Sequence, residues 1–161
     1  MAIMLVTVVS LIPFLGMKES TPASEELEWY KEIVHLYVIN NSGIFIVDFP
    51  FKEGLEYDPD LFSGGISGIK TILQEMIKSQ QSLKIIDHED LKLIFEYGQN
   101  FFVVLISQKD LKILRTKLKA LTGEIERVFR EVLADWSGNL DVFKPINTMI
   151  KNIFLKDVKK A

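Results

Sequence analysis

The chain has 161 residues, 48% of them hydrophobic and 25% charged, which is typical of one globular domain with a single core. Its formal net charge is −3, which argues against a nucleic-acid partner because phosphate backbones are neutralised by a concentrated basic face. The chain contains no cysteine, so disulfides, thiolate metal sites and cysteine nucleophiles are excluded, and a cytoplasmic location is expected.

Residues 1–17 carry no charged side chain, and four interpretations of them remain open. A secretory signal needs a basic start, which is missing, and a small-residue cleavage site, of which Thr21-Pro22-Ala23 is a poor version. A membrane anchor needs roughly 20 apolar residues, and Pro13 interrupts this shorter run. The β-branched Val6–Val9 favours a strand that pairs with a sheet edge of this chain or of a neighbour. In the fourth interpretation, translation begins at Met17 and the segment has little meaning.

Residues 18–32 are expected to form a linker and a short helix that lead into one domain over residues 33–161. Ser, Thr, Pro and Glu replace the apolar residues in this linker. A helix over Glu25–Glu32 is indicated by Ser24 and the two glutamates after it, because hydroxyl and carboxylate oxygens accept hydrogen bonds from the free amides of a helix start.

Two apolar runs, His35–Asn40 and Ile44–Phe49, predict the strands of an opening β-hairpin. The Asn-Ser-Gly between them tolerates the positive φ of a tight turn, and Pro50 ends the second strand because it cannot donate a ladder hydrogen bond. The start of this strand lacks the lysines or bulges that normally protect an exposed edge, so the chain is predicted to form a homodimer or a heteromer. The residues predicted to bind the partner here are Ile44, Phe45 and Ile46.

A helix is expected from Leu61 to about Ser79, with Asp60 as its N-cap. Apolar residues recur along it at steps of three and four, which indicates one buried face. They are Phe62, Ile66, Ile69, Leu73 and Met76. Three glycines each lower the helix propensity by up to about 1 kcal/mol, so their clustering indicates that another backbone comes close, most simply in packing on the sheet. These glycines are Gly64, Gly65 and Gly68.

The same helix carries a set of small or polar side chains beside the apolar stripe, which predicts a second partner surface. The set consists of Ser63, Ser67, Lys70 and Gln74. A lack of bulky charge is typical of interface centres. The alternative is that this part of the helix only packs on the sheet.

Three further strands are expected at Leu83–Ile86, Leu91–Tyr97 and Phe101–Ser107, joined by turns short enough for antiparallel hairpins. The last of them is apolar from Phe101 to Ile106 and should therefore lie at the centre of the sheet. The middle strand alternates apolar and charged positions, so one of its faces is expected to be partly exposed.

A long amphipathic helix is expected over Lys109–Trp136, with Gly123 as the position of a kink. Its apolar stripe comprises Leu111, Leu114, Leu118, Leu121, Ile125, Val128, Val132 and Trp136, of which the tryptophan is expected to anchor the helix end in the core. A shorter terminal helix is outlined by Phe143, Ile146, Ile150 and Phe154. The predicted fold is therefore α+β, with the element order β-β-α-β-β-β-α-α.

No catalytic centre, metal site or cofactor site is expected, because no convergent set of reactive side chains is visible. The two histidines, His35 and His88, are more often structural than catalytic. Asp58-Pro59-Asp60 lacks the glycine and the distal glutamate of a calcium loop. Gly64–Thr71 is no phosphate loop, since its glycine and lysine are not adjacent, and Ser67 lacks the second glycine of a nucleophile elbow.

Four lysines lie near the C-terminus, and they are interpreted mainly as a solvated helix end. They are Lys151, Lys156, Lys159 and Lys160. The alternative is contact with an anionic membrane surface if residues 1–17 also hold the chain there.

Three segments together resemble the longin-like branch of the longin and roadblock superfamily. They are the hairpin Tyr37–Ile46, the helix start Asp60–Ile69 and the stretch Trp136–Phe143. The resemblance covers Ile33 to Phe154. It implies a five-stranded antiparallel sheet with the first long helix on one face and the two later helices on the other.

The resemblance implies binding rather than catalysis. Members of the superfamily are subunits of trafficking adaptors, tethering and exchange complexes and signal-recognition receptors, often as dimers that present helices to a small GTPase. The expected partner is therefore a small GTPase or another longin- or roadblock-type subunit. A different class is the alternative: a membrane-tethered sensory domain of the PAS or Cache type that binds a small ligand, although such sensors usually end on strands rather than on two helices.

Overall fold

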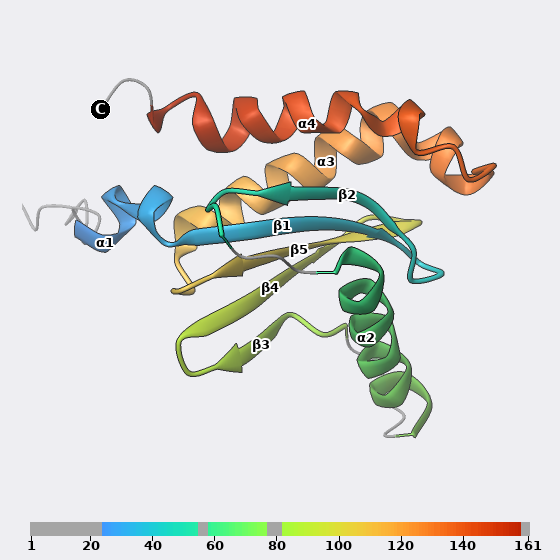
Figure 1. Cartoon of the computed structure of the whole chain (residues 1–161), viewed down its shortest axis with the longest axis horizontal. Coiled ribbons are helices and arrows are strands. Elements are labelled where there is room, and N and C mark those ends of the chain that lie inside the picture. Colours follow the sequence, from blue (N-terminus) through green and yellow to red (C-terminus); the bar gives the residue numbers. More distant parts are fainter. Residues whose placement is uncertain (1–23, 55–57, 77–81, 159–161) are drawn as a thin grey trace, which may run out of the picture.

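The computed structural model describes residues 24–54, 58–76 and 82–158, so the predictions for residues 1–17 lie outside its described residues. It shows an α+β structure with one open five-stranded sheet (Figure 1). In chain order the elements are α1 (Ser24–Leu27), the 3-10 turn η1 (Trp29–Lys31), β1 (Ile33–Asn40), β2 (Phe45–Pro50), α2 (Pro59–Thr71), the π-helical turn η2 (Ile72–Met76), β3 (Ile85–His88), β4 (Leu91–Tyr97), β5 (Phe101–Ser107), α3 (Lys112–Ala134), the 3-10 turn η3 (Leu140–Phe143), α4 (Pro145–Ile150) and the π-helical turn η4 (Lys151–Leu155).

The sheet is antiparallel, with the strand order β2-β1-β5-β4-β3. The predicted opening hairpin is confirmed, and Gly43 in its turn has the positive φ of 86° that the sequence indicated. The central position predicted for β5 is also confirmed, because β5 pairs with both β1 and β4 and all its residues are buried. β3 begins at Ile85, two residues later than expected, and only two residues separate it from β4.

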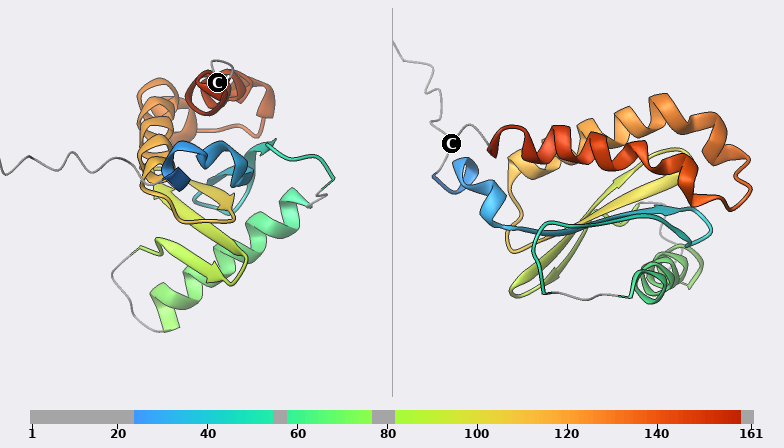
Figure 2. Two further views of the ribbon diagram at one scale, coloured as in Figure 1. Left: turned by 90° about the vertical axis from the view of Figure 1, so that its left-hand side faces the viewer. Right: turned by 45° about the horizontal axis from the view of Figure 1, so that its top comes forward.

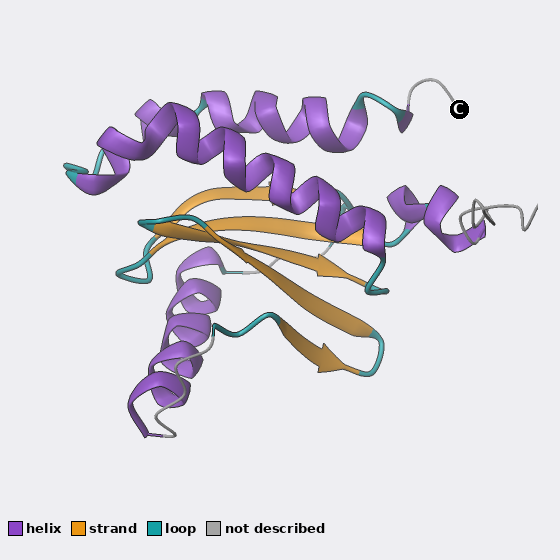
Figure 3. Cartoon of the chain, turned by 180° about the vertical axis from the view of Figure 1, so that it is seen from behind, coloured by secondary structure: helices purple, strands orange, loops and turns teal. Residues whose placement is uncertain are grey.

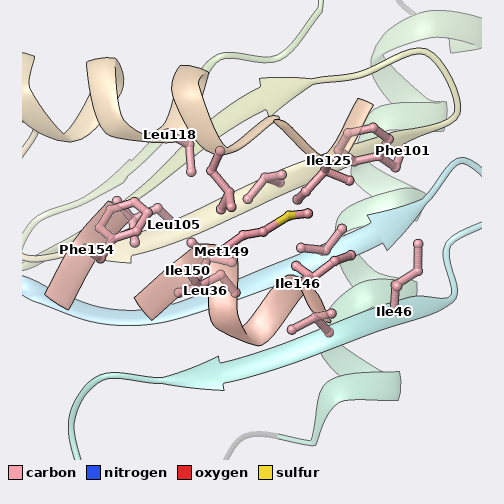
Figure 4. Close-up of a cluster of buried hydrophobic side chains, with 14 of the residues drawn as sticks. Leu36, Ile46, Phe101, Leu105, Leu118, Ile125, Ile146, Met149, Ile150 and Phe154 are labelled. Carbon is pink, nitrogen blue, oxygen red and sulfur yellow. The ribbon is translucent and has the colours of Figure 1, made fainter. Parts of the chain in front are cut away.

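Helices cover both faces of the central strands, which explains why β5 is apolar from Phe101 to Ile106 (Figures 2 and 3). Alternate side chains of a strand point to opposite faces, so β5 contributes to two separate cores. The core under α3 and α4 takes Phe101, Val103 and Leu105, and the core under α2 takes Phe102 and Val104. Figure 4 shows the first of these cores, where Leu36 and Leu105 of the sheet meet Leu118 of α3 and Ile150 of α4.

The buried face of α3 follows the prediction in its first half and departs from it in its second. Val128 and Val132 are exposed, and Phe129 and Leu133 are buried in their place. The buried face rotates because this half of α3 packs on the C-terminal layer, where the Phe129 ring lies 5.5 Å from that of Phe143. α3 continues without interruption through Gly123, the position of the predicted kink.

The C-terminal layer is built as predicted, apart from Trp136. Phe143, Ile146, Ile150 and Phe154 are all fully buried. Trp136 lies beyond the last residue of α3 and is only half-buried, with its indole 5.6 Å from the Phe143 ring and its Nε1 donating to the Asn139 carbonyl at 3.0 Å. It therefore packs at the margin of the core rather than anchoring its centre.

The start of α2 differs from the prediction by two residues. The N-cap is Asp58, whose carboxylate accepts from the amides of Asp60 at 3.0 Å and Leu61 at 3.1 Å. Pro59 occupies the first helical position, where a backbone N–H would have no partner within the helix, so its absence costs no hydrogen bond. A carboxylate one residue before this proline is better placed to reach the free amides than Asp60, which already lies inside the helix.

The glycines of α2 face away from the rest of the described chain, contrary to the prediction that another backbone approaches them. A Cβ built at Gly64, Gly65 or Gly68 meets no atom within 4 Å. The close approach involves Gly43 of the hairpin turn instead, where a Cβ would lie 2.7 Å from the Ser67 hydroxyl. α2 thus packs on the sheet through its serine side, and the glycine that permits this contact belongs to the hairpin.

Candidate interaction surface

β2 is an open edge of the sheet. It pairs with β1 on one side only, and no strand in the described ranges pairs with its other side. Of the residues predicted to bind a partner here, Ile46 is buried, Phe45 is partly buried, and Ile44, in the hairpin turn just before the strand, is 48% exposed. The edge therefore combines unpaired backbone groups with an exposed apolar side chain at one end, which is the arrangement on which another strand can pair.

A groove of about 250 Å³ runs beside this edge. One wall is the stretch from Phe45 to Asp48, and the other is formed by η3 and the start of α4, including Leu140 and Phe143. Leu140 and the neighbouring Val142 are exposed. An incoming segment would thus meet apolar surface from the C-terminal layer as well as the backbone of β2. Sequence pattern did not indicate this second wall, because its residues lie more than ninety positions away from β2 in the chain.

Two of the four residues predicted as a platform on α2 face inward. Ser63 is 1% exposed, and its hydroxyl donates to the Asp60 carbonyl at 3.2 Å. The hydroxyl of Ser67 is buried against Gly43 and has no hydrogen-bond partner among the described residues. In this structure Ser63 offers no surface to a partner, and Ser67 is part of the contact between α2 and the hairpin.

Lys70 also points toward the sheet rather than into a platform. Its ammonium lies 3.7 Å from the ring centre of Phe102 and 5.1 Å from that of Tyr97, in the range of cation–π contacts. Burial lowers the pKa of Lys70 and raises the pKa of Tyr97 to about 12. Of the predicted platform, only Gln74 is clearly exposed. Whether any of these residues contacts a partner stays a prediction.

The outer face of α2 is apolar and small, which the sequence pattern did not reveal. Leu61, Ile69 and Ile72 are 76%, 41% and 49% exposed, and they flank the outward-facing glycines Gly64 and Gly68. Ile69 was predicted to be buried, but the sheet contacts the opposite side of this helix turn. The composition of α2 did indicate exposed apolar surface, because its apolar residues are too widely spread to face the sheet all at once.

The two histidines lie in different surroundings, His35 inside the sheet and His88 at its surface. His35 is buried, and its Nε2 contacts the carboxylate of Asp48 across the β1–β2 ladder. Its ring stacks on that of Tyr37, which in turn stacks on Phe62 of α2 at 4.3 Å. His88 is exposed at the end of β3. Nowhere in residues 24–54, 58–76 and 82–158 do three or more potential metal ligands come together.

Within the same ranges, no helix combines the length and the apolar character needed to cross a membrane. No protein-family model matches the chain, and no curated protein matches it.

Proposed function

We propose that this chain is a longin-like interaction module without catalytic activity, which joins a homodimer or a larger complex through the open edge of β2. The observation that carries the proposal is the unpaired edge of β2 beside an apolar groove. An added strand gains main-chain hydrogen bonds from such an edge, and the groove gives its side chains a place to bind.

The longin-like part of the proposal is supported by the resemblance of the sequence and by the arrangement of layers. α2 packs on one face of the antiparallel sheet, and α3 and α4 pack on the other. The partner proposed on this basis is a small GTPase or another longin- or roadblock-type subunit.

A PAS- or Cache-type sensory domain would bind its ligand against the central strands of the sheet, and no cavity is observed there among the described residues. Leu36, Tyr37 and Leu105 of the central strands are fully buried under the helices on the two faces. The sheet surface that a PAS- or Cache-type ligand would occupy is filled by side chains of the chain itself.

The proposal is tested by comparing two exposed apolar residues of nearly equal accessibility. Ile44 is 48% exposed next to the β2 edge, and Val128 is 46% exposed on α3. Ile44→Lys places a charge where a partner strand would pair, whereas Val128→Lys adds the same charge elsewhere. Both variants should fold, since neither side chain is buried.

Tagged wild-type chain and both variants would be purified from native cells, with GDP or a non-hydrolysable GTP analogue in the buffer. We expect a small GTPase or a longin- or roadblock-type subunit to accompany the wild type and Val128→Lys but not Ile44→Lys. Equal recovery with Ile44→Lys would place the interface elsewhere. An enzyme activity retained by all three purified chains would contradict the non-catalytic role.

A further inference from the structure

A basic cavity of about 350 Å³ lies between α3 and the outer part of the sheet. On the helix side it is lined by Lys112, Arg115 and Lys119. On the sheet side it is lined by Lys84, which precedes β3, and by Glu96 of β4. Basic side chains from two separate segments therefore face one cavity, although the whole chain carries a net charge of −3.

The fold brings these side chains together in a simple way. Lys112, Arg115 and Lys119 are spaced by three and four residues, so they share one face of α3. α3 lies over the centre of the sheet, and β4 and β3 extend beyond it on one side (Figure 3). Lys84 is held beside β4 by its carbonyl, which accepts from the Phe95 amide at 2.9 Å. The cavity is thus the angle between the basic side of α3 and the uncovered part of the sheet.

The charge in this cavity is only partly compensated. Among the described residues, the ammonium groups of Lys84, Lys112 and Lys119 have no hydrogen-bond or ion-pair partner. Arg115 is held by Asp110, whose two carboxylate oxygens accept from Nε at 2.7 Å and from Nη2 at 2.6 Å. The lining itself holds four cationic groups and one carboxylate, that of Glu96, while the carboxylates of Asp110 and Glu26 lie against Arg115 and the backbone of Lys112.

This charge and volume select the class of ligand. A phosphomonoester carries a charge of roughly −1.5 to −2 near pH 7 and has three acceptor oxygens, whereas a carboxylate carries only −1. A volume of about 350 Å³ falls within the range of small-molecule sites, roughly 300 to 1,000 Å³. The fully buried Ile94 and Leu118 add apolar surface to its lining. We infer that the cavity binds a phosphomonoester on a small polar body, with Lys84 and Lys119 gripping it from opposite walls.

Such a phosphate can come from a free metabolite or from a lipid headgroup. The lipid headgroup is tested as a source because α1 is attached to the N-terminal end of α3, where the cavity lies. Glu26 of α1 accepts from the backbone amides of Lys112 and Ile113, so the apolar residues 1–17 precede a helix that is attached beside the cavity. If those residues enter a bilayer, the cavity lies near its headgroups.

The test uses the full chain and probes that share one phosphomonoester. Glycerol 3-phosphate represents the free ligand and would be titrated by calorimetry, with glycerol as the control. Vesicles with phosphatidic acid represent the headgroup and would be compared in flotation with vesicles of equal phosphatidylglycerol content, whose phosphate is a diester.

The site variant is Lys84→Gln with Lys119→Gln. The matched control is Lys151→Gln with Lys156→Gln, which removes the same charge from exposed lysines of the C-terminal segment.

We expect saturable binding of glycerol 3-phosphate or of phosphatidic acid vesicles, weakened at least tenfold by the site variant and little by the control. Binding of glycerol 3-phosphate without a preference for phosphatidic acid vesicles identifies a metabolite site. Preferential binding of phosphatidic acid vesicles without binding of glycerol 3-phosphate identifies a headgroup site. Binding should also weaken as pH falls below about 6, where the phosphate gains a proton. Equal losses in both variants, absence of binding to either probe, or tighter binding of an acidic peptide would overturn the inference. Unchanged thermal melts of the variants show that folding is not the cause of a loss.

Discussion

Glu26 is one of the residues that attach α1 to the rest of the domain. Its carboxylate accepts from the amide of Lys112 at 2.9 Å and from that of Ile113 at 3.0 Å. Leu111 occupies the N-cap position of α3 and cannot cap it with an apolar side chain. A carboxylate from α1 therefore satisfies the free amides of α3 and complements the positive end of its dipole. Sequence reasoning assigned the glutamates only to their own helix, because this cap comes from a distant part of the chain.

Replacing Glu26 by alanine should lower the free energy of unfolding by about 1 kcal/mol, the usual cost of a lost N-cap. Urea unfolding at neutral pH measures this change. Glu25→Ala is the matched control, since Glu25 pairs with the exposed Lys109 at 3.2 Å and such surface pairs contribute little. If the two variants are equally stable, α3 does not depend on this cap.

Tyr97 should make the stability of the protein depend on pH in the alkaline range. Burial raises its pKa from 10.0 to about 12, and its hydroxyl donates to the Leu83 carbonyl. The folded state keeps this proton while the unfolded chain loses it, so the stabilisation is complete below pH 10 and is lost as pH rises toward 12. Lys70 changes the stability with pH in the opposite direction. Burial lowers its pKa, so the folded state loses this charge before the unfolded chain does, and stability gains as pH rises toward 10.5.

The contribution of Tyr97 is isolated by comparing the wild type with Tyr97→Phe, since Lys70 is present in both. At pH 9 the variant should be less stable, because it lacks the hydrogen bond to Leu83. The difference between the two proteins should shrink as pH rises from 10 to 12. Denaturant unfolding at several pH values tests this, and a difference that is constant with pH would contradict it.

At the scale of elements, the glycines of α2 and of the hairpin turn are predicted to behave in opposite ways. Gly64 and Gly68 lie in a helix with free space where a Cβ would be, so Gly64→Ala and Gly68→Ala should each raise stability by roughly 0.5 to 1 kcal/mol. Gly43→Ala should lower it, since the turn has a φ of 86° and the new Cβ would strike Ser67. Thermal melts compare all three.

The melting temperatures of the glycine variants also test whether the outer face of α2 is exposed. If Gly64→Ala and Gly68→Ala lower the melting temperature, then α2 does not have the exposed orientation described above. If they raise it and yet weaken association, the partner reaches this face of α2 as well as β2.

The elements that sequence reasoning placed well are those whose signals are local. The two runs flanking Gly43 predicted the first hairpin, and the apolar run Phe101–Ile106 predicted the central strand. The errors arise where tertiary packing decides. Pattern alone could not show that α2 turns Ser63 inward and Ile69 outward, or that the end of α3 rotates to bury Phe129. The same limit applies to the candidate surface, of which the β2 side was predicted and the η3 side was not.

At the scale of the whole molecule, the two edges of the sheet differ. β3 is short, its edge residues Asp87 and His88 are exposed, and Glu89 and Asp90 follow in the turn, which are features that prevent strand pairing. β2 is longer and more apolar. The prediction that it lacks a bulge is wrong, because its register against β1 shifts between Phe45 and Val47 and leaves Ile46 unpaired. Its edge is nevertheless accompanied by a groove and by exposed apolar residues of η3. Helices cover both faces of the central strands, so the proposed interface extends the sheet at its β2 edge.

The central claim is tested most directly by the mass of the assembly that contains this chain. Size-exclusion chromatography with light scattering would be applied to the wild type, Ile44→Lys and Val128→Lys after gentle purification from native cells. We predict a dimer or a heteromeric complex for the wild type and for Val128→Lys, and a single free chain for Ile44→Lys. A wild type that is strictly monomeric, or an Ile44→Lys variant with the same mass as the wild type, would contradict the account.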